Sequence, residues 1–382
     1  MLEGPRAAKP EELDDIVHLV NSVFMLRHNL PPLMKDRFPH IFDKSNLENL
    51  RVIVCDGKPV SHVGIWEGHL LICGCWFKVG MLGSVCTHPD YRNRGYASAL
   101  VKDALSKMRR DNVDFVLISG SRGLYKRLGC VEAGRIYIYN LRREELNLDS
   151  EGIDLIGYDE SHLRDIIRIY HMEPVRYKRS LEDFSLLAGR EISVGHVKIK
   201  TYIIMADGEP MAYVAVKSIR DPSTLEIYEY AGSRNAILHA LRILHEILDV
   251  NVIRLAVPHQ DMNMLHLLER IGLERPPSTA QAVFSIINPQ SFLGKVKPYL
   301  EERIGKERSE ELISNLTDGR IRLYLNGEMV SPQDPRALTL LFFGSPEKLR
   351  GPPQPVVRME PHPEFISDAL PLPTPIHGLN YI

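Results

Sequence analysis

Apolar residues at helical spacing predict two long helices in the first third of the chain. The first covers residues 11–25 and follows a proline, with two acidic residues in its first turn. The second covers residues 96–110 and carries a regular apolar stripe on one face. Short apolar runs bounded by turn residues predict strands at 51–56, 59–66, 70–75, 77–83 and 113–119. This order predicts a mixed α/β fold.

An irregular arm follows the first predicted helix. Residues 26–42 mix prolines with large apolar side chains. These side chains either pack into the core or wall a pocket. The large apolar residues of the arm and of the helix end before it are Phe24, Met25, Leu30, Met34, Phe38 and Phe42.

The stretch 83–95 joins a predicted strand to the second helix through a turn at Pro89 and a basic loop. Gly95 stands at the start of that helix, where backbone N–H groups and the helix dipole favour an anion. Arg92 and Arg94 add positive charge at the same place. The loop therefore suits a phosphorylated cofactor.

The pattern of the first part starts again after residue 151. Residues 267–273 align with residues 124–130, which indicates an internal repeat of a whole domain. The second copy has the loop 231–236 in place of the basic glycine loop, and Leu268 in place of Tyr125. We therefore expect no cofactor in the second copy. The basic segment 176–179 is open to three interpretations: a solvated face, a subunit contact or a substrate site.

A third region begins near residue 288. It contains helical patterns at 291–303 and 309–316, a hairpin around Asn326-Gly327, and an apolar run at 337–343. The last 32 residues are rich in proline, and the end of the chain is apolar enough to dock. The predicted domains are 1–148, 149–287 and 288–382.

Composition narrows the class of protein. Charged residues make up 25% and the net charge is −2, which argues against a nucleic-acid-binding protein. No apolar run reaches the roughly 18 residues of a membrane span, and no signal-peptide pattern is present. Five cysteines, an odd number, indicate reduced thiols and a cytoplasmic protein, and their spacing predicts no metal site.

Two motifs resemble those of the GNAT acetyltransferase superfamily. The sequence Arg92-Asn93-Arg94-Gly95-Tyr96-Ala97 satisfies the cofactor signature Q/R-x-x-G-x-G/A. Tyr125 precedes Gly129 by four residues, as in the second marker of that superfamily. Over the full length, a GNAT domain, a degenerate second GNAT domain and a small α+β region resemble the enhanced-intracellular-survival (Eis) type of acetyltransferase. In that type the third region is similar to a sterol carrier protein, and the chains form hexamers.

The resemblance implies acetyl-CoA as cosubstrate and assigns roles to particular residues. It implies that Tyr125 protonates the departing thiolate and that the terminal carboxylate, here of Ile382, is the base. An ordinary docked terminus is the alternative for Ile382. Cys86 and His88 are interpreted as a packing residue and a turn residue. The residues expected to contact the cofactor are Val85, Cys86, Thr87, Arg92, Asn93, Arg94, Gly95, Tyr96, Ala97 and Ser121.

The predicted function is transfer of an acetyl group to a primary amine through a ternary complex. Aminoglycosides, polyamines and lysine side chains are the candidate acceptors, and a homo-oligomer is expected. One alternative is a regulatory protein that senses acetyl-CoA or binds an apolar ligand without turnover. Another is transfer of a longer acyl group.

Overall fold

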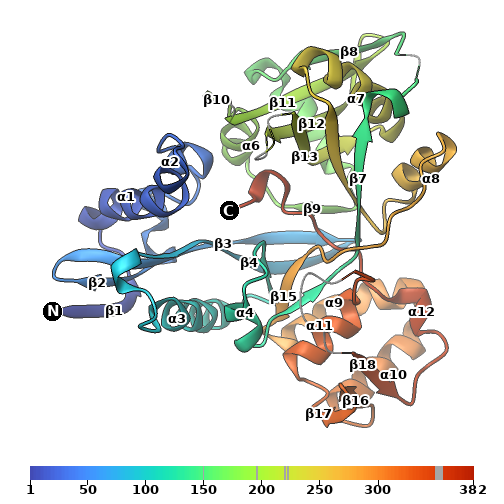
Figure 1. Cartoon of the computed structure of the whole chain (residues 1–382). Helices are drawn as coiled ribbons and strands as arrows, with labels where there is room; N and C mark the ends of the chain where they lie inside the picture. The colour runs from blue at the N-terminus through green and yellow to red at the C-terminus, as the bar shows by residue number, and fades with distance from the viewer. Residues whose placement is uncertain (149, 195–196, 219–220, 222, 349–355) are drawn as a thin grey trace.

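The computed structural model describes residues 1–382 except 149, 195–196, 219–220, 222 and 349–355. Two large sheets flanked by helices form the first two regions, and a mainly helical third region packs below the first sheet in Figure 1. This confirms the mixed α/β fold class, and the two sheets are consistent with tandem GNAT folds. Among the described residues, no helix has the length and apolar character needed to cross a membrane.

The first sheet is built mainly from the N-terminal part of the chain. Its order is β1 (Leu2–Ala7), β2 (Leu50–Cys55), β3 (Lys58–Ile72), β4 (Cys75–Thr87), β5 (Phe115–Ile118), β15 (Ala282–Ile286) and β6 (Val131–Ala133), with β9 (Val175–Tyr177) beside β3. Residues 59–66 and 70–75 were predicted as separate strands. That prediction is wrong, because β3 runs without a break and the chain turns at Cys73 and Gly74, both at positive φ.

The second sheet has a similar plan. Its order is β10 (Ile192–Val194), β11 (Val197–Ala206), β12 (Glu209–Ser218), β13 (Thr224–Gly232), β14 (Val252–Pro258) and β7 (Ile136–Arg142), with β8 (Ile153–Gly157) beside β11. In each sheet the parallel pair is formed by strands that flank a long helix: β4 with β5, and β13 with β14.

Three strands cross between the halves of the chain. β9 comes from the predicted second domain but pairs with β3 of the first sheet. β7 follows the first sheet in sequence but pairs with β14 of the second sheet. β15 follows the second sheet in sequence but lies between β5 and β6 of the first. The predicted division at residues 148 and 149 therefore does not separate the two sheets, although as a boundary between domains it stays a prediction.

The predicted helical segments 11–25 and 96–110 are helices in the structure, and residues 181–188 form a helix that was not predicted. The structure contains α1 (Leu13–Phe24), α2 (Met34–Arg37), α3 (Tyr96–Arg110), α4 (Gly123–Arg127), α5 (Leu163–His171), α6 (Leu181–Ala188), α7 (Arg234–Leu248) and α8 (Met262–Arg270). One face of α3 is buried through Leu100, Val101, Ala104, Leu105 and Met108, which confirms the predicted stripe.

The third region shares a core with the first sheet. It contains α9 (Pro289–Ile304), α10 (Lys306–Thr317), α11 (Pro335–Phe343), α12 (Ile366–Ala369), and the three-stranded sheet β17 (Glu328–Val330), β16 (Arg322–Leu325), β18 (Val357–Glu360). The predicted hairpin at Asn326-Gly327 is confirmed. The apolar run at 337–343 lies in α11, and its ring Phe343 stacks on Phe284 of β15 at 4.9 Å between centroids. Part of the proline-rich tail, 351–355, lies outside the described residues.

The end of the chain returns to the middle of the molecule. From the third region the tail runs upward and ends between the two sheets (Figure 1). Residues 372–375 and 377–380 of this tail are all buried, so the terminus is docked as predicted.

Candidate active site

A cavity of about 310 Å³ opens where β4 and β5 separate. The two strands pair in parallel from Val79 opposite Phe115 to Leu82 opposite Ile118. Ser84 then adopts φ 53°, next to a register shift in the pairing with β3. Past this point Ser84 and Val85 on one strand, and 119–120 after the other, line the cavity. Backbone groups of β4 on this side are therefore available to a ligand that enters between the strands.

The basic loop lies next to this opening, at the start of α3. Gly95 is the N-cap at φ 80° and supplies no side chain, so the first N–H groups of the helix stay open to an anion. The Arg92 Nε donates to the Thr87 carbonyl at 3.3 Å, and the Arg94 Nη2 donates to the Asp90 carbonyl at 3.1 Å. Within the described residues neither guanidinium pairs with a carboxylate. The loop is exposed and basic, as a phosphate site requires.

Tyr125 lines the cavity from α4. Its side chain is buried, and burial raises the pKa of its phenol. In the described part of the chain no group hydrogen-bonds its hydroxyl. A phenol that keeps its proton, and whose hydroxyl has no hydrogen-bond partner among the described residues, is able to donate a proton within the cavity.

The arm after α1 forms the opposite wall. Phe24, Met25, Met34 and Phe38 line the cavity, whereas Phe42 is buried in the core beneath it. The arm therefore fulfils both of the roles that the sequence left open.

Ile382 ends the chain in this same cavity. A Cβ on Gly83 of β4 would lie 2.6 Å from the carbonyl carbon of Ile382, so only glycine leaves room for the terminus there. Tyr381 also lines the cavity, with its ring centroid 6.1 Å from that of Phe38. The structure thus brings residues 125 and 382 to one cavity.

The second sheet holds the tail that carries Ile382. Arg179 makes a bidentate ion pair with Glu229 of β13, at 2.8 and 2.6 Å, and neither side chain is more than 4% exposed. Glu229 also accepts the Leu379 N–H at 2.8 Å, and Arg179 donates to Asn380 at 2.8 Å. Arg179, in the basic segment 176–179, is thus buried and contacts the tail. The sequence analysis did not consider this role.

Several predicted residues lie outside the cavity. Cys86 is buried in the core and does not line the cavity, and burial raises the pKa of its thiol to about 12. Ser121 is exposed, and its neighbours Ser119 and Arg122 line the cavity instead. His88 caps the short turn before the basic loop, accepting the Asp90 N–H at 3.4 Å.

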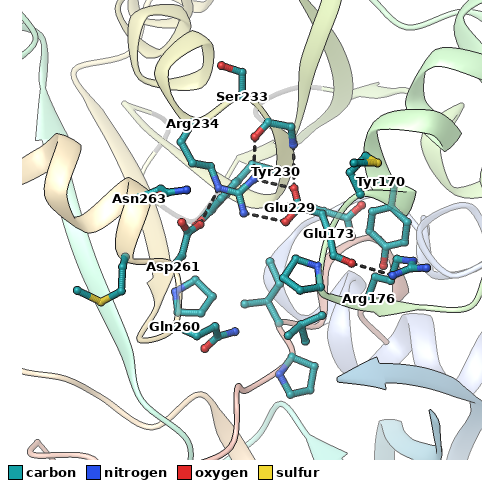
Figure 2. A pocket seen from close by; sticks show the side chains of 18 of the residues that line it. Tyr170, Glu173, Arg176, Glu229, Tyr230, Ser233, Arg234, Gln260, Asp261 and Asn263 are labelled. Atoms are coloured by element: carbon teal, nitrogen blue, oxygen red, sulfur yellow. Dashed lines mark hydrogen bonds and ion pairs between the residues drawn. The ribbon is translucent and has the colours of Figure 1, made fainter. Parts of the chain in front are cut away.

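The corresponding place in the second sheet is occupied by the protein's own groups (Figure 2). There β13 separates from β14 and leads into α7, beside a cavity of about 780 Å³. Glu173 accepts from the Gly232 N–H at 2.9 Å and from Arg234 at 2.7 and 2.8 Å. Asp261 accepts from Arg234 and from the Tyr230 hydroxyl, both at 2.8 Å. An anion would have to displace these carboxylates.

Residues 5–133 match the family model described as acetyltransferase (GNAT) domain. This part of the chain is a GNAT domain. The match includes β4, the basic loop, α3 and Tyr125. No curated protein matches the chain.

Solved structures with the same fold cover about three quarters of the chain. A probable N-acyltransferase from Enterococcus faecalis V583 has a TM-score of 0.58 and 16% identity, over 77% of this chain and 74% of that one. A GCN5-related N-acetyltransferase from Anabaena variabilis has a TM-score of 0.55 and 16% identity, over 75% and 73%. Eis1 from Mycobacterium abscessus has a TM-score of 0.53 and 15% identity, over 77% and 76%. At these identities the likeness shows the fold alone.

Proposed function

We propose that the chain is an acetyl-CoA-dependent N-acetyltransferase that acetylates a primary amine in a ternary complex. One observation carries the proposal: Tyr125 and Ile382 line a single cavity at the separated ends of β4 and β5, next to a GNAT cofactor loop. The three-region plan and the docked tail support an Eis-type enzyme.

The residues present fit acetyl-CoA. The N–H groups at the start of α3, together with Arg92 and Arg94, would hold its pyrophosphate. The open edge of β4 at Val85 and Thr87 would pair with the pantetheine arm. A β4 N–H would polarise the thioester carbonyl, which makes the carbonyl carbon the site of attack.

Tyr125 is assigned the role of general acid. In the reaction the amine nitrogen bonds to the carbonyl carbon, the carbon–sulfur bond breaks, and the Tyr125 hydroxyl gives its proton to the thiolate. Because burial raises the pKa of this phenol, the proton is present at neutral pH.

The terminal carboxylate of Ile382 is assigned the role of base. A neutral amine is needed for attack, and the proton that the amine loses must be accepted inside the cavity. No aspartate, glutamate or histidine lines it within the part of the chain that the structure describes. The terminus is held by burial of Ile382, at 6% exposure, and by the Gly83 contact.

Thiol release in the steady state, measured with acetyl-CoA and a panel of primary amines, tests the function. We expect turnover by the wild type, and a kcat about 100-fold lower for Tyr125→Phe because general acid catalysis contributes that order of rate. The Kd for acetyl-CoA should stay within twofold. Tight acetyl-CoA binding without turnover on any amine would instead indicate a sensor, and wild-type kcat in Tyr125→Phe would remove the acid role.

A further inference from the structure

The charges around the cavity are unusual for a site that accepts a polyamine or an aminoglycoside. Its charged side chains are Arg37 and Arg122, and no acidic side chain lines it. Among the described residues that line the cavity, the terminal carboxylate of Ile382 is the group that carries negative charge. An acceptor with several ammonium groups would meet the half-buried guanidinium of Arg37 and the exposed one of Arg122, and this repulsion is unfavourable.

The two arginines belong to different sides of the cavity. The Arg122 Nη1 donates at 3.3 Å to the carbonyl of Val85, on the strand assigned to the cofactor. Arg37 ends α2 in the arm that forms the opposite wall, 5.7 Å from the Phe38 ring centroid. Arg37 therefore faces the space left for the acceptor.

The guanidinium of Arg37 lacks a strong partner. Its Nη1 lies 3.9 Å from the Met25 sulfur, a weak acceptor, and its Nε is buried with no hydrogen bond. In the described ranges of the chain it pairs with no carboxylate. Burial lowers the pKa of Arg37, which reflects the cost of holding this charge away from water. Arg37 is half-buried, and holding a partly desolvated cation without an ion pair is costly, so a ligand that supplies a carboxylate to this guanidinium would bind well.

Arg190, which contacts Arg37, shows the contrast. Its guanidinium donates to three carbonyls: Leu187 at 3.2 Å, Arg37 at 2.6 Å and Leu379 at 2.9 Å. Those bonds explain Arg190 as a structural link between the arm and the tail. They also fix the backbone of Arg37, so that its side chain is presented to the cavity from a held position.

We propose that Arg37 binds an anionic group of the acceptor, so that the substrate is an amine that also carries a carboxylate. This inference rests on the proposed N-acetyltransferase function. The planar fork of a guanidinium matches a carboxylate in two parallel hydrogen bonds. Phe24, Met34 and Phe38 would pack on an apolar body between the two ends of the acceptor. The acceptor class is therefore an amino acid with its reactive amine distant from its carboxylate.

Matched acceptors test this assignment. Hexylamine, hexamethylenediamine and ε-aminocaproate share one chain length and one reactive amine, and differ at the far end in charge. We expect the kcat/KM of the wild type to be about tenfold or more higher for ε-aminocaproate, mainly through a lower KM. One charged hydrogen-bonded pair contributes a binding free energy of that order.

Variants of Arg37 supply the second arm of the experiment. Arg37→Gln should lower kcat/KM for ε-aminocaproate by about tenfold more than for hexylamine and so remove the preference. Arg37→Glu should shift the preference to hexamethylenediamine. Lys35→Gln changes an exposed cation of the same helix that does not line the cavity, and is the control. A wild type that uses the diamine as well as ε-aminocaproate would overturn the proposal, as would an equal loss for all three acceptors in Arg37→Gln.

Failure of the general function gives a different result. If no amine is acetylated, the N-acetyltransferase proposal fails. Calorimetric titration of the acetyl-CoA-loaded protein with ε-aminocaproate then still decides whether Arg37 forms an anion site. Binding that Arg37→Gln weakens by about tenfold supports that site, and equal affinity in the two proteins overturns it.

Discussion

At the end of β4 in the first sheet, and at the end of β13 in the second, the chain follows the same course. A strand leaves its parallel neighbour and leads into a helix of 15 residues. In the first sheet Gly95 begins the helix without a side-chain cap. In the second, Ser233 caps the helix, and its hydroxyl accepts the Ala236 N–H at 3.2 Å.

The groups inside the two openings differ as the helix starts do: those of the first are open to a ligand, and those of the second bond to one another. The first has an exposed basic loop and the hydroxyl of Tyr125, which has no hydrogen-bond partner in the described part of the chain. The second is crossed by the Arg234 ion pairs with Glu173 and Asp261. Separation of two strands leaves backbone and polar groups without partners in the sheet, and these groups bond to water, to a ligand or to the protein itself. The first opening is suited to a ligand. In the second, the protein's own side chains make these bonds.

The tail links the two openings. Thr374 exchanges hydrogen bonds with Gln260 at the second, and Leu379 donates to the buried Glu229. Three residues later Ile382 lies in the first. The second sheet thus holds the segment whose end completes the cavity of the first.

The largest expected effect comes from closing the first opening at its loop. Gly95→Val places a branched side chain at φ 80°, where L-residues are strained, and changes the path of the N–H groups that would bind pyrophosphate. We expect acetyl-CoA binding, measured by calorimetry, to be lost, and the wild type to bind one molecule per chain. Gly57→Val is the matched control, since Gly57 also has φ 80° and open space but lies in the turn between β2 and β3. A stoichiometry of two, or unchanged affinity in Gly95→Val, would contradict the comparison.

The loop and Tyr125 were predictable because their signals are local. Gly95 lies within six residues that form the signature, and Tyr125 stands four residues before Gly129. The long helices α1 and α3 were predictable for the same reason, since each carries its own period. The composition of the arm predicted either core packing or a pocket wall. Arg37 was not singled out, because an arginine in the charged run Lys35-Asp36-Arg37 gives no sign in the sequence that it lines a cavity.

Long-range pairing was not predictable. β7 and β15 are short apolar strands that suit either sheet, and their sequence does not say which neighbour they choose. Arg179 and Glu229 are 50 residues apart, so the buried pair leaves no local pattern. In isolation, a basic segment such as 176–179 is expected on the surface. These features are fixed by tertiary packing.

A second expected effect comes from moving the end of the chain. Three residues added after Ile382 would displace its carboxylate from the Gly83 contact, where no spare room exists. We expect kcat to fall about 100-fold, as for loss of a general base, with the Kd for acetyl-CoA unchanged. Ile382→Val keeps the carboxylate and the chain length and should retain most of the activity. Intact mass spectrometry establishes where each variant ends, and full activity in the extended protein would exclude the terminus as base.

The smallest effect is expected from weakening the hold of the second sheet on the tail. Glu229→Gln removes the buried carboxylate that pairs with Arg179, and it weakens the hydrogen bond that the Leu379 N–H donates to residue 229. We expect kcat to fall about tenfold through misplacement of Ile382, and carboxypeptidase to release the last residues faster. Glu173→Gln is the control, because it weakens an ion pair of the same region that has no hydrogen bond to the tail. Equal carboxypeptidase rates in the two variants would contradict a role for Glu229 in holding the tail.

The pH dependence of tail release tests the same contact without a substitution. Burial alone would raise the pKa of the Glu229 carboxyl, but Arg179 outweighs it and holds that pKa below its ordinary value of 4.5. The contribution of Glu229 is therefore complete above pH 4.5 and is lost as the pH falls through the lowered pKa. Hydrogen–deuterium exchange at the Leu379 amide, measured by mass spectrometry, is compared with exchange at other buried amides. Relative to them, it should stay slow from neutral pH down to the lowered pKa of Glu229 and become faster below that pKa. In Glu229→Gln that acid transition should be absent, because the glutamine does not titrate.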